Sequence, residues 1–228
     1  MDILLQIEEA WKAVPGTDGI LHGRKRLRYG TPNGRPKLFS SIKNGAFIPV
    51  RNITEFKYCY VLEADVDVIR YRTRPIELET RQGTILADFV TWNKTGKACV
   101  TNVLRRGQDN SPRTLARLAQ WRAALQKVNV AFFHITERNL PVGIQMENLT
   151  LAYNRGAIRF TAEVLTGYAL DFVSNLKAEE RTVQRLQSLF HYLNYPPGFL
   201  EAAIFHGFLA IAGNRPYGPA AVVEVRSG

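Results

Sequence analysis

Hydrophobic residues recur with a helical period near the start of the chain. Ile3, Ile7, Trp11 and Val14 fall on one face of residues 3–14, between polar and charged positions. This spacing predicts an amphipathic helix. Its apolar face either packs on the core of the protein or docks onto a partner, and the sequence leaves both interpretations open.

In the central part of the chain, a helical period gives way to alternation of apolar and polar positions. Residues 51–64 are predicted to form a helix, with Ile53, Tyr58, Val61 and Leu62 facing the core. Four strands are then predicted, the first two from alternation, and the last two are joined by a hairpin loop. The strands cover residues 66–72, 76–80, 84–92 and 97–104, and the loop covers residues 93–96. The last strand is rich in Val, Ala and Cys, which is typical of a buried central strand.

A second helix and a further strand follow the hairpin. Ser111 before Pro112 is a favourable helix start and predicts a helix that runs to Lys127. Residues 128–135 are mostly apolar and are predicted to form a buried strand, with His134 as a core residue. An antiparallel hairpin followed by a helix and a strand predicts an α/β fold with a mixed sheet and a helical crossover.

From residue 145 onward the pattern becomes mainly helical. Amphipathic segments and a short apolar end predict three helices and a terminal strand, at residues 161–176, 179–195, 199–212 and 220–225. This order indicates either a small winged-helix-like domain or a helical cap on the first domain. We therefore expect three parts, namely an N-terminal amphipathic helix at 1–20, a central domain with a basic arm at 21–145, and a C-terminal domain at 146–228.

Composition sets the class of the protein. The chain has 228 residues, of which 46% are hydrophobic, enough for one sizeable core. Cys59 and Cys99 lie in apolar runs without a zinc spacing, so we expect reduced core cysteines. The sequence shows no secretory leader and no apolar run long enough to span a bilayer. We expect a soluble intracellular protein without a membrane partner.

Positive charge is concentrated in two blocks. The net charge is +10, and residues 19–54 carry eight Lys or Arg and no acid. Residues 105–127 carry six basic residues and one acid, while residues 55–104 are balanced at seven of each sign. Segregated basic blocks on both sides of a balanced segment indicate a polyanion lying across it, although an ordinary basic surface is the alternative.

The basic blocks supply the candidate nucleic-acid contacts. We predict an extended arm between residues 19 and 50, whose cations bind DNA phosphates without reading the sequence. Further contacts come from the second block. The predicted nucleic-acid-binding residues are Arg24, Lys25, Arg26, Arg28, Arg35, Lys37, Lys43, Arg105, Arg106, Arg113 and Arg117.

The balanced segment contains a candidate magnesium site. Glu55 on the predicted helix, Asp88 on a predicted strand and Asn102 on its hairpin partner offer oxygen ligands, which Mg²⁺ prefers. Such a site can hydrolyse a phosphodiester by activating water and stabilising the leaving oxygen. Leu104 shares a strand face with Asn102 and can supply neither function. Because Asp88 lies among apolar residues, burial demands a partner for it, either a metal ion or an arginine.

The segment from about Arg26 to Leu140 resembles the TnsA endonuclease subunit of heteromeric Tn-type transposases, a family with a restriction-endonuclease-like fold. The shared motifs are Lys37-Leu38-Phe39-Ser40-Ser41, Glu55 on a helix, the run from Leu62 to Val68, Arg74-Pro75, Asp88-Phe89 and Ile135-Thr136-Glu137. In the family pattern a Glu and an Asp are followed by Glu or Gln, with Lys two residues later. Glu55 and Asp88 match it, while Asn102 and Leu104 depart from it.

The resemblance implies a protein of DNA transposition that binds transposon-end duplex DNA beside a DDE-type transposase. It also implies a C-terminal winged-helix-like domain and a location in the prokaryotic cytoplasm, near the nucleoid. Two outcomes stay open for the chemistry. Either Arg105, Arg106, Arg113 or Arg117 replaces the missing lysine in a Mg²⁺-dependent nickase, or the fold binds DNA and assembles without cleaving it. Whether the chain forms an oligomer is also open.

Overall fold

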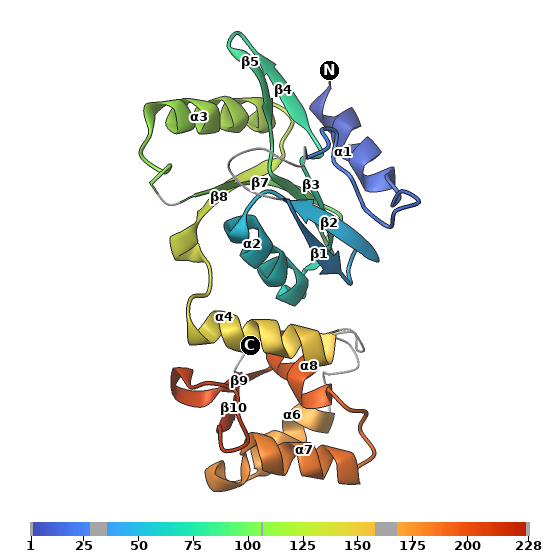
Figure 1. The fold of residues 1–228 in the computed structure, drawn as a ribbon, viewed down its shortest axis with the longest axis vertical. Helices are drawn as coiled ribbons and strands as arrows, with labels where there is room; N and C mark the ends of the chain where they lie inside the picture. Colours follow the sequence, from blue (N-terminus) through green and yellow to red (C-terminus); the bar gives the residue numbers. More distant parts are fainter. Residues whose placement is uncertain (1, 28–35, 106, 158–167, 227–228) are drawn as a thin grey trace. The chain divides into compact units, whose positions relative to one another are not determined.

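The computed structural model describes residues 2–27, 36–105, 107–157 and 168–226. The chain divides into two compact units (Figure 1). The first contains residues 1–63 and 67–140, and the second contains residues 64–66 and 141–228. Of the arm predicted between residues 19 and 50, residues 28–35 lie outside the described residues, whereas its end forms a hairpin of two short strands at Lys37–Ser41 and Ala46–Val50.

A four-stranded mixed sheet forms the centre of the first unit. Its strands, in spatial order, are β3 (Val68–Thr73), β6 (Phe89–Asn93), β7 (Ala98–Leu104) and β8 (Ala131–Thr136). The first three are antiparallel, and β8 runs parallel to β7. Helix α3 (Pro112–Gln126) makes the crossover from β7 to β8, and it starts at Ser111 as predicted, with the Ser111 side chain accepting from the N–H of Thr114. The mixed α/β class is confirmed.

Helix α2 (Ile53–Ala64) carries Glu55 to this sheet. Asn52 precedes the helix, and its Oδ1 accepts from the Glu55 N–H at 3.0 Å, which satisfies one donor of the first turn. Tyr58 packs edge-on against Phe89 with ring centroids 5.0 Å apart. The predicted core position of Ile53 is wrong, because this residue begins the helix and is 47% exposed.

Two hairpins flank the sheet. The first pairs β1 (Lys37–Ser41) with β2 (Ala46–Val50), within the segment for which an extended arm was predicted. The second pairs β4 (Glu77–Thr80) with β5 (Gly83–Leu86). The predicted single strand over residues 84–92 is therefore wrong, since the chain leaves β5 after Leu86 and joins the main sheet at Phe89.

Asp88 lies in the bend between β5 and β6 rather than on a strand. Its carbonyl accepts from the N–H of Arg74, and its own N–H donates to Asn102 Oδ1 at 3.1 Å. These bonds replace the ladder hydrogen bonds of a continuous strand. Residues 84–92 form one mostly apolar run without Gly or Pro, so the sequence gave no signal of the break.

Strand β8 is half exposed instead of buried, which corrects the prediction for residues 128–135. Phe133 is 61% exposed, and His134 is exposed rather than in the core. The reason is position: among the described strands, β8 pairs with β7 alone and forms the edge of the sheet. An apolar run does not distinguish an edge strand from a central one.

Helix α1 (Ile3–Lys12) packs on the first unit, which decides between the two interpretations of its apolar face. Ile3 and Ile7 are buried in a cluster that includes Trp121 and Leu125. Gln6 is fully buried and forms two hydrogen bonds with the backbone of Glu77, as donor at 3.1 Å and as acceptor at 2.8 Å. Val14 lies beyond the helix end and is 79% exposed, contrary to the predicted face.

The second unit is mainly helical and ends in a small antiparallel strand pair. Its helices are α4 (Ile144–Ala152), α6 (Tyr168–Asn175), α7 (Val183–Tyr192) and α8 (Phe199–Phe205), and its strands are β9 (Leu209–Ile211) and β10 (Val223–Val225). Short helical turns of this unit lie at Tyr153–Ala157, Ala178–Glu180 and Ala212–Asn214, and a further turn, at Glu137–Asn139, belongs to the first unit. Helix α8 ends earlier than predicted, because the chain turns at Gly207, with φ +77°, into β9. Among the described residues, no helix combines the length and apolarity that a membrane span requires.

Candidate functional site: an arginine-bridged acid pair beside a basic cleft

The structure brings together Glu55, Asp88 and Asn102. All three are buried, with exposed fractions of 2% or less. Asn102 lies on β7 and reaches the Asp88 bend through the hydrogen bond from the Asp88 N–H. Asp88 Oδ2 in turn accepts from the N–H of Val103 at 2.8 Å. The three side chains that the sequence pointed to therefore form one cluster at the end of β7.

Arg51 bridges the two carboxylates of this cluster. Its Nε donates to Glu55 Oε1 at 2.6 Å, and its Nη2 lies 2.6 Å from the same oxygen and also contacts Asp88 Oδ1. Its backbone N–H donates to Glu55 Oε2 at 2.7 Å. Asp88 thus has the arginine partner that was one of the two solutions predicted for a buried carboxylate.

The cluster balances its charges internally. Arg74 Nη1 lies 3.8 Å from Glu55 Oε2, so two guanidinium groups face two carboxylates. Burial opposes charge on Arg51, yet the two acids raise the pKa of its guanidinium above the ordinary value. Burial raises the pKa of the Asp88 carboxyl, and the charge of Arg51 opposes that rise. Burial lowers the pKa of Arg74 to about 10, so it stays charged at neutral pH.

In this arrangement the residues do not fit a bound Mg²⁺. Each carboxylate oxygen of Glu55 and Asp88 accepts a hydrogen bond, and Asn102 Oδ1 accepts from the Asp88 N–H. The Arg51 guanidinium occupies the space between the acids that a metal would need. Within the described part of the chain, no group of three or more His, Cys, Asp or Glu is placed to hold a metal ion. Leu104, two residues after Asn102 on β7, is completely buried.

A polar cleft of about 510 Å³ opens beside the acid pair, with Arg51 in its wall. Arg113 and Arg117 from α3 also line it. The other lining residues are amides, hydroxyls and two apolar side chains, and no acid is among them: Thr80, Gln82, Thr84, Ile85, Leu86, Gln108, Ser111, Thr114 and Gln120. The cleft therefore combines three cations with neutral hydrogen-bonding groups.

The other predicted nucleic-acid contacts have different surroundings. Arg24 pairs with Glu9 and donates to the Pro75 carbonyl, and Lys43 Nζ donates to the Leu62 carbonyl at 2.8 Å. Lys37 lies over the Phe56 ring, 5.7 Å from its centroid. Lys25, Arg26 and Arg105 are exposed, and Arg28, Arg35 and Arg106 lie outside the described residues.

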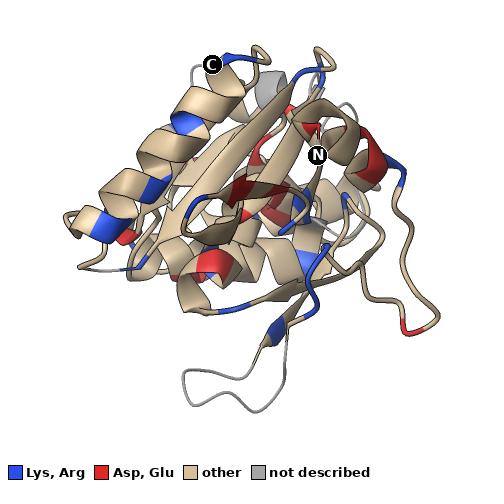
Figure 2. Cartoon of the chain, turned by 90° about the horizontal axis from the view of Figure 1, so that it is seen from above, with Lys and Arg blue, Asp and Glu red and all other residues tan. Residues whose placement is uncertain are grey.

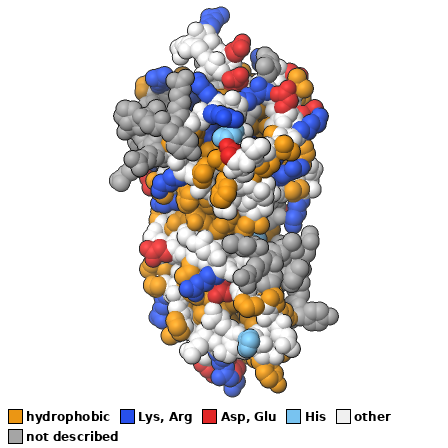
Figure 3. All heavy atoms as spheres, turned by 45° about the vertical axis from the view of Figure 1, so that its right-hand side comes forward, with side chains coloured by type: hydrophobic (Ala, Val, Ile, Leu, Met, Phe, Trp, Pro, Cys, Tyr) orange, Lys and Arg blue, Asp and Glu red, His pale blue; other side chains and the backbone are white. Residues whose placement is uncertain are grey.

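The scatter of charge on the face drawn in Figure 3 does not single out the site. On the face drawn in Figure 3, Lys and Arg are scattered among acidic and hydrophobic side chains. Helix α3, at the left of Figure 2, carries basic residues along its length and no acid. The site is therefore defined by the cleft and by α3 beside it.

Arg51 is a functional candidate that was not predicted from the sequence. It belongs to the first basic block but is not among the predicted DNA-binding or metal-binding residues. The available signal was its spacing of four residues before Glu55, which places two opposite charges within reach at the start of a helix. That spacing alone does not reveal the contact with Asp88, which comes from 37 residues further along the chain.

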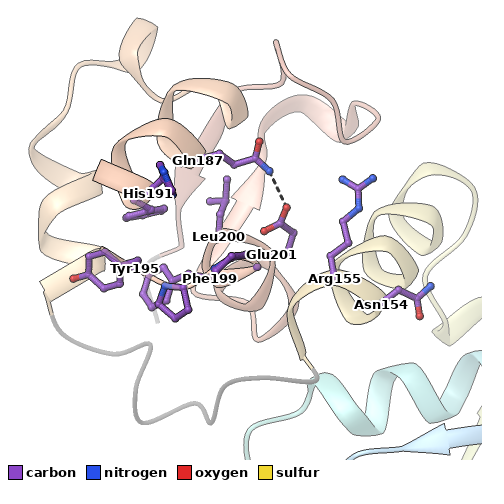
Figure 4. A pocket seen from close by; sticks show the side chains of 12 residues that line it. Asn154, Arg155, Gln187, His191, Tyr195, Phe199, Leu200 and Glu201 are labelled. Atoms are coloured by element: carbon purple, nitrogen blue, oxygen red, sulfur yellow. Dashed lines mark hydrogen bonds between the residues drawn. The ribbon is translucent and has the colours of Figure 1, made fainter. Parts of the chain in front are cut away.

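The second unit contains a separate cavity of about 490 Å³ with a different lining (Figure 4). Buried Glu201 accepts from Gln187 Nε2 at 2.9 Å and from the Tyr217 hydroxyl at 2.7 Å. Burial raises the pKa of Tyr217, and its bond to Glu201 raises it further. Gly198, with φ +88°, passes so close to the Arg155 carbonyl that an added Cβ would lie 2.4 Å from it. These contacts stabilise the second unit. Because two protein side chains already donate hydrogen bonds to buried Glu201, its carboxylate does not require a ligand.

The sequence comparisons identify no family for this chain. No protein-family profile matches the chain, and the search of curated proteins gives no match either.

Proposed function

We propose that the protein binds double-stranded DNA through the cleft lined by Arg51, Arg113 and Arg117 and does not cleave it. The observation that carries the proposal is the composition of this cleft, in which three arginines face neutral polar groups and no acid. Phosphate oxygens are bound by such arginines and by amide and hydroxyl donors. The basic block around residues 19–54 adds long-range attraction to the same polyanion.

The fold supports this proposal as a restriction-endonuclease-like core. The order helix α2, antiparallel strands β3, β6 and β7, crossover helix α3 and parallel strand β8 is consistent with the restriction-endonuclease-like fold that the resemblance to TnsA implies. Helices followed by the β9–β10 pair support a winged-helix-like second unit. A transposase partner and a place in DNA transposition belong to the proposal through the resemblance.

Two features favour binding over cleavage. Arg51 occupies the space between Glu55 and Asp88, and Leu104 offers no cation at the position where the family pattern has lysine. Arg113 and Arg117 line the cleft, but a cation in the cleft does not free the carboxylates for a metal. The rival function, Mg²⁺-dependent nicking, requires Arg51 to leave the acid pair.

Fluorescence anisotropy with a labelled duplex, at several salt concentrations, tests the proposal. The Arg113→Gln, Arg117→Gln double variant should bind more weakly. Its log–log salt slope should be shallower by about 0.9 for each phosphate that the variant no longer binds. Arg122→Gln is the matched control, because Arg122 lies on the same helix outside the cleft.

Equal weakening in the control and in the double variant would overturn the cleft as the binding site. Wild-type binding without salt dependence would overturn DNA binding by charge altogether. The same samples, incubated with supercoiled plasmid and Mg²⁺, should show no nicking; nicking that Asp88→Ala abolishes would establish the endonuclease function instead.

A further inference from the structure

Arg51 belongs both to the acid cluster and to the cleft. Its Nε, its Nη2 and its backbone N–H are engaged by Glu55 and Asp88. Its remaining group, Nη1, makes no hydrogen bond within the part of the chain that the structure describes. The side chain stays 34% exposed and lines the cleft. One edge of the guanidinium is therefore fixed by the acids, while the side chain remains accessible from the cleft.

We propose that Glu55 and Asp88 are positioning residues that hold Arg51 as a fixed phosphate-binding group in the cleft wall. The ligand is a phosphodiester of the DNA backbone. The acids act on DNA through Arg51 and not through a metal ion. This inference rests on the proposed DNA binding, and it assigns to the acid pair a task that the resemblance does not imply.

Preorganisation gives the physical reason. A free arginine side chain loses rotamer freedom when it binds a phosphate, and an arginine already held in place has lost that entropy on folding. The planar guanidinium presents several N–H groups in a rigid fork, so the edge formed by Nε and Nη2 can bind the acids while Nη1 binds an anion. Lysine has no such geometry. Arg117 lines the same cleft, and its buried Nε has no hydrogen-bond partner among the described residues, so a second donor is available there.

The inference predicts that removing an acid weakens DNA binding, which is the opposite of the usual effect. Loss of a carboxylate near a DNA site normally strengthens binding, because it removes repulsion between like charges. If Asp88 holds Arg51 for a phosphate, Asp88→Asn should instead weaken binding, roughly three- to tenfold, because the guanidinium loses its fixed position. Glu8→Gln is the matched control, since it makes the same charge change on an exposed residue of α1 outside the cleft.

Two further variants test the arginine itself. Arg51→Met should make the log–log salt slope shallower by about 0.9, the value for one phosphate contact. Arg51→Lys retains the charge but not the fork, so it should also bind more weakly than wild type. Thermal unfolding of each variant shows whether it is folded, and Glu55→Gln replaces Asp88→Asn if the latter does not fold.

Anisotropy measurements with the labelled duplex, in EDTA and then in Mg²⁺, decide between the outcomes. Weakening by Asp88→Asn in EDTA, beside an unchanged Glu8→Gln, supports the inference. Binding by Asp88→Asn equal to or tighter than that of Glu8→Gln overturns it, as does wild-type binding that requires Mg²⁺. If Arg113→Gln, Arg117→Gln weakens binding while Asp88→Asn does not, this inference fails and the proposed function stands; if none of them weakens it, the proposed function fails.

Discussion

Glu55 accepts hydrogen bonds from both the side chain and the backbone of Arg51, at 2.6 Å and 2.7 Å. The contact fixes the segment before α2 as well as the guanidinium. Because the same guanidinium reaches Asp88, one arginine ties the start of a helix to the bend before β6. The acid pair thus has a structural role that is separate from any role in DNA binding.

Replacing Arg51 with Met should destabilise the first unit strongly. The substitution leaves Glu55 and Asp88 buried without their main cation, and breaking one side of a buried ion pair costs roughly 3–5 kcal/mol. Because Arg51 is one-third exposed, we expect a loss near the lower end of that range. Urea denaturation followed by tryptophan fluorescence measures it. Arg113→Met, on an exposed residue, should change the free energy of unfolding little, and an equal decrease there would contradict the assignment.

Gln6→Leu should loosen α1 while keeping the apolar character of its buried face. The variant removes both hydrogen bonds to the Glu77 backbone and leaves a buried N–H and C=O unsatisfied, which costs about 1–3 kcal/mol for each group. Hydrogen exchange should then increase in α1 and β4. Gln6→Glu retains the acceptor but loses the donor and buries a carboxylate beside the Glu77 carbonyl, so it should loosen α1 at least as much as Gln6→Leu. Unchanged exchange in both variants would show that Ile3 and Ile7 alone hold the helix.

The elements predicted correctly are those whose residue pattern is compatible with only one type of secondary structure. The helix at 51–64, the hairpin at 93–96 and the Ser111 helix start all appear close to their predicted positions. The prediction of one strand over residues 84–92 was wrong at Asp88, since a mostly apolar run without Gly or Pro can still turn from one hairpin into another sheet. The prediction of a buried strand was wrong at β8, because exposure of a strand depends on its neighbours and not on its own residues.

The sequence predicted which acidic residues form the site, but it did not predict that an arginine bridges them. Glu55, Asp88 and Asn102 were identified from residue type and order, and they do meet. What fills the space between them depends on Arg51, whose short side-chain distances arise only when α2 and the Asp88 bend come together. Spacing along the chain contains no information about that contact.

Glu63 should make the stability of the first unit depend on pH. Burial raises the pKa of Glu63 above its ordinary value of 4.5, while hydrogen bonds from Ser41 and Tyr71 oppose the rise. The folded state then holds the proton more tightly than the unfolded state, so the free energy of unfolding falls as pH rises from 4.5 through the folded pKa. Glu63→Gln cannot titrate but can still accept from both hydroxyls.

Denaturation of wild type and Glu63→Gln across this pH interval tests the sign. The stability of wild type relative to the variant should decrease as pH rises and level off above the folded pKa. A relative increase would mean that the hydrogen bonds outweigh burial and depress the pKa.

Leu104→Lys, which introduces the lysine that a TnsA-like site would have, should not create a nickase. Leu104 is fully buried, so the ammonium must enter the interior and would be destabilised by burial unless it finds a carboxylate. Both nearby carboxylates are already paired with Arg51. We expect a lower melting temperature and no nicking of supercoiled plasmid in Mg²⁺.

The double variant Arg51→Met, Leu104→Lys removes the competing cation and should recover part of the stability that the two single variants lack. Nicking by Leu104→Lys alone would show that Arg51 yields its position to a metal ion, and the acid pair would then have to be regarded as a catalytic site.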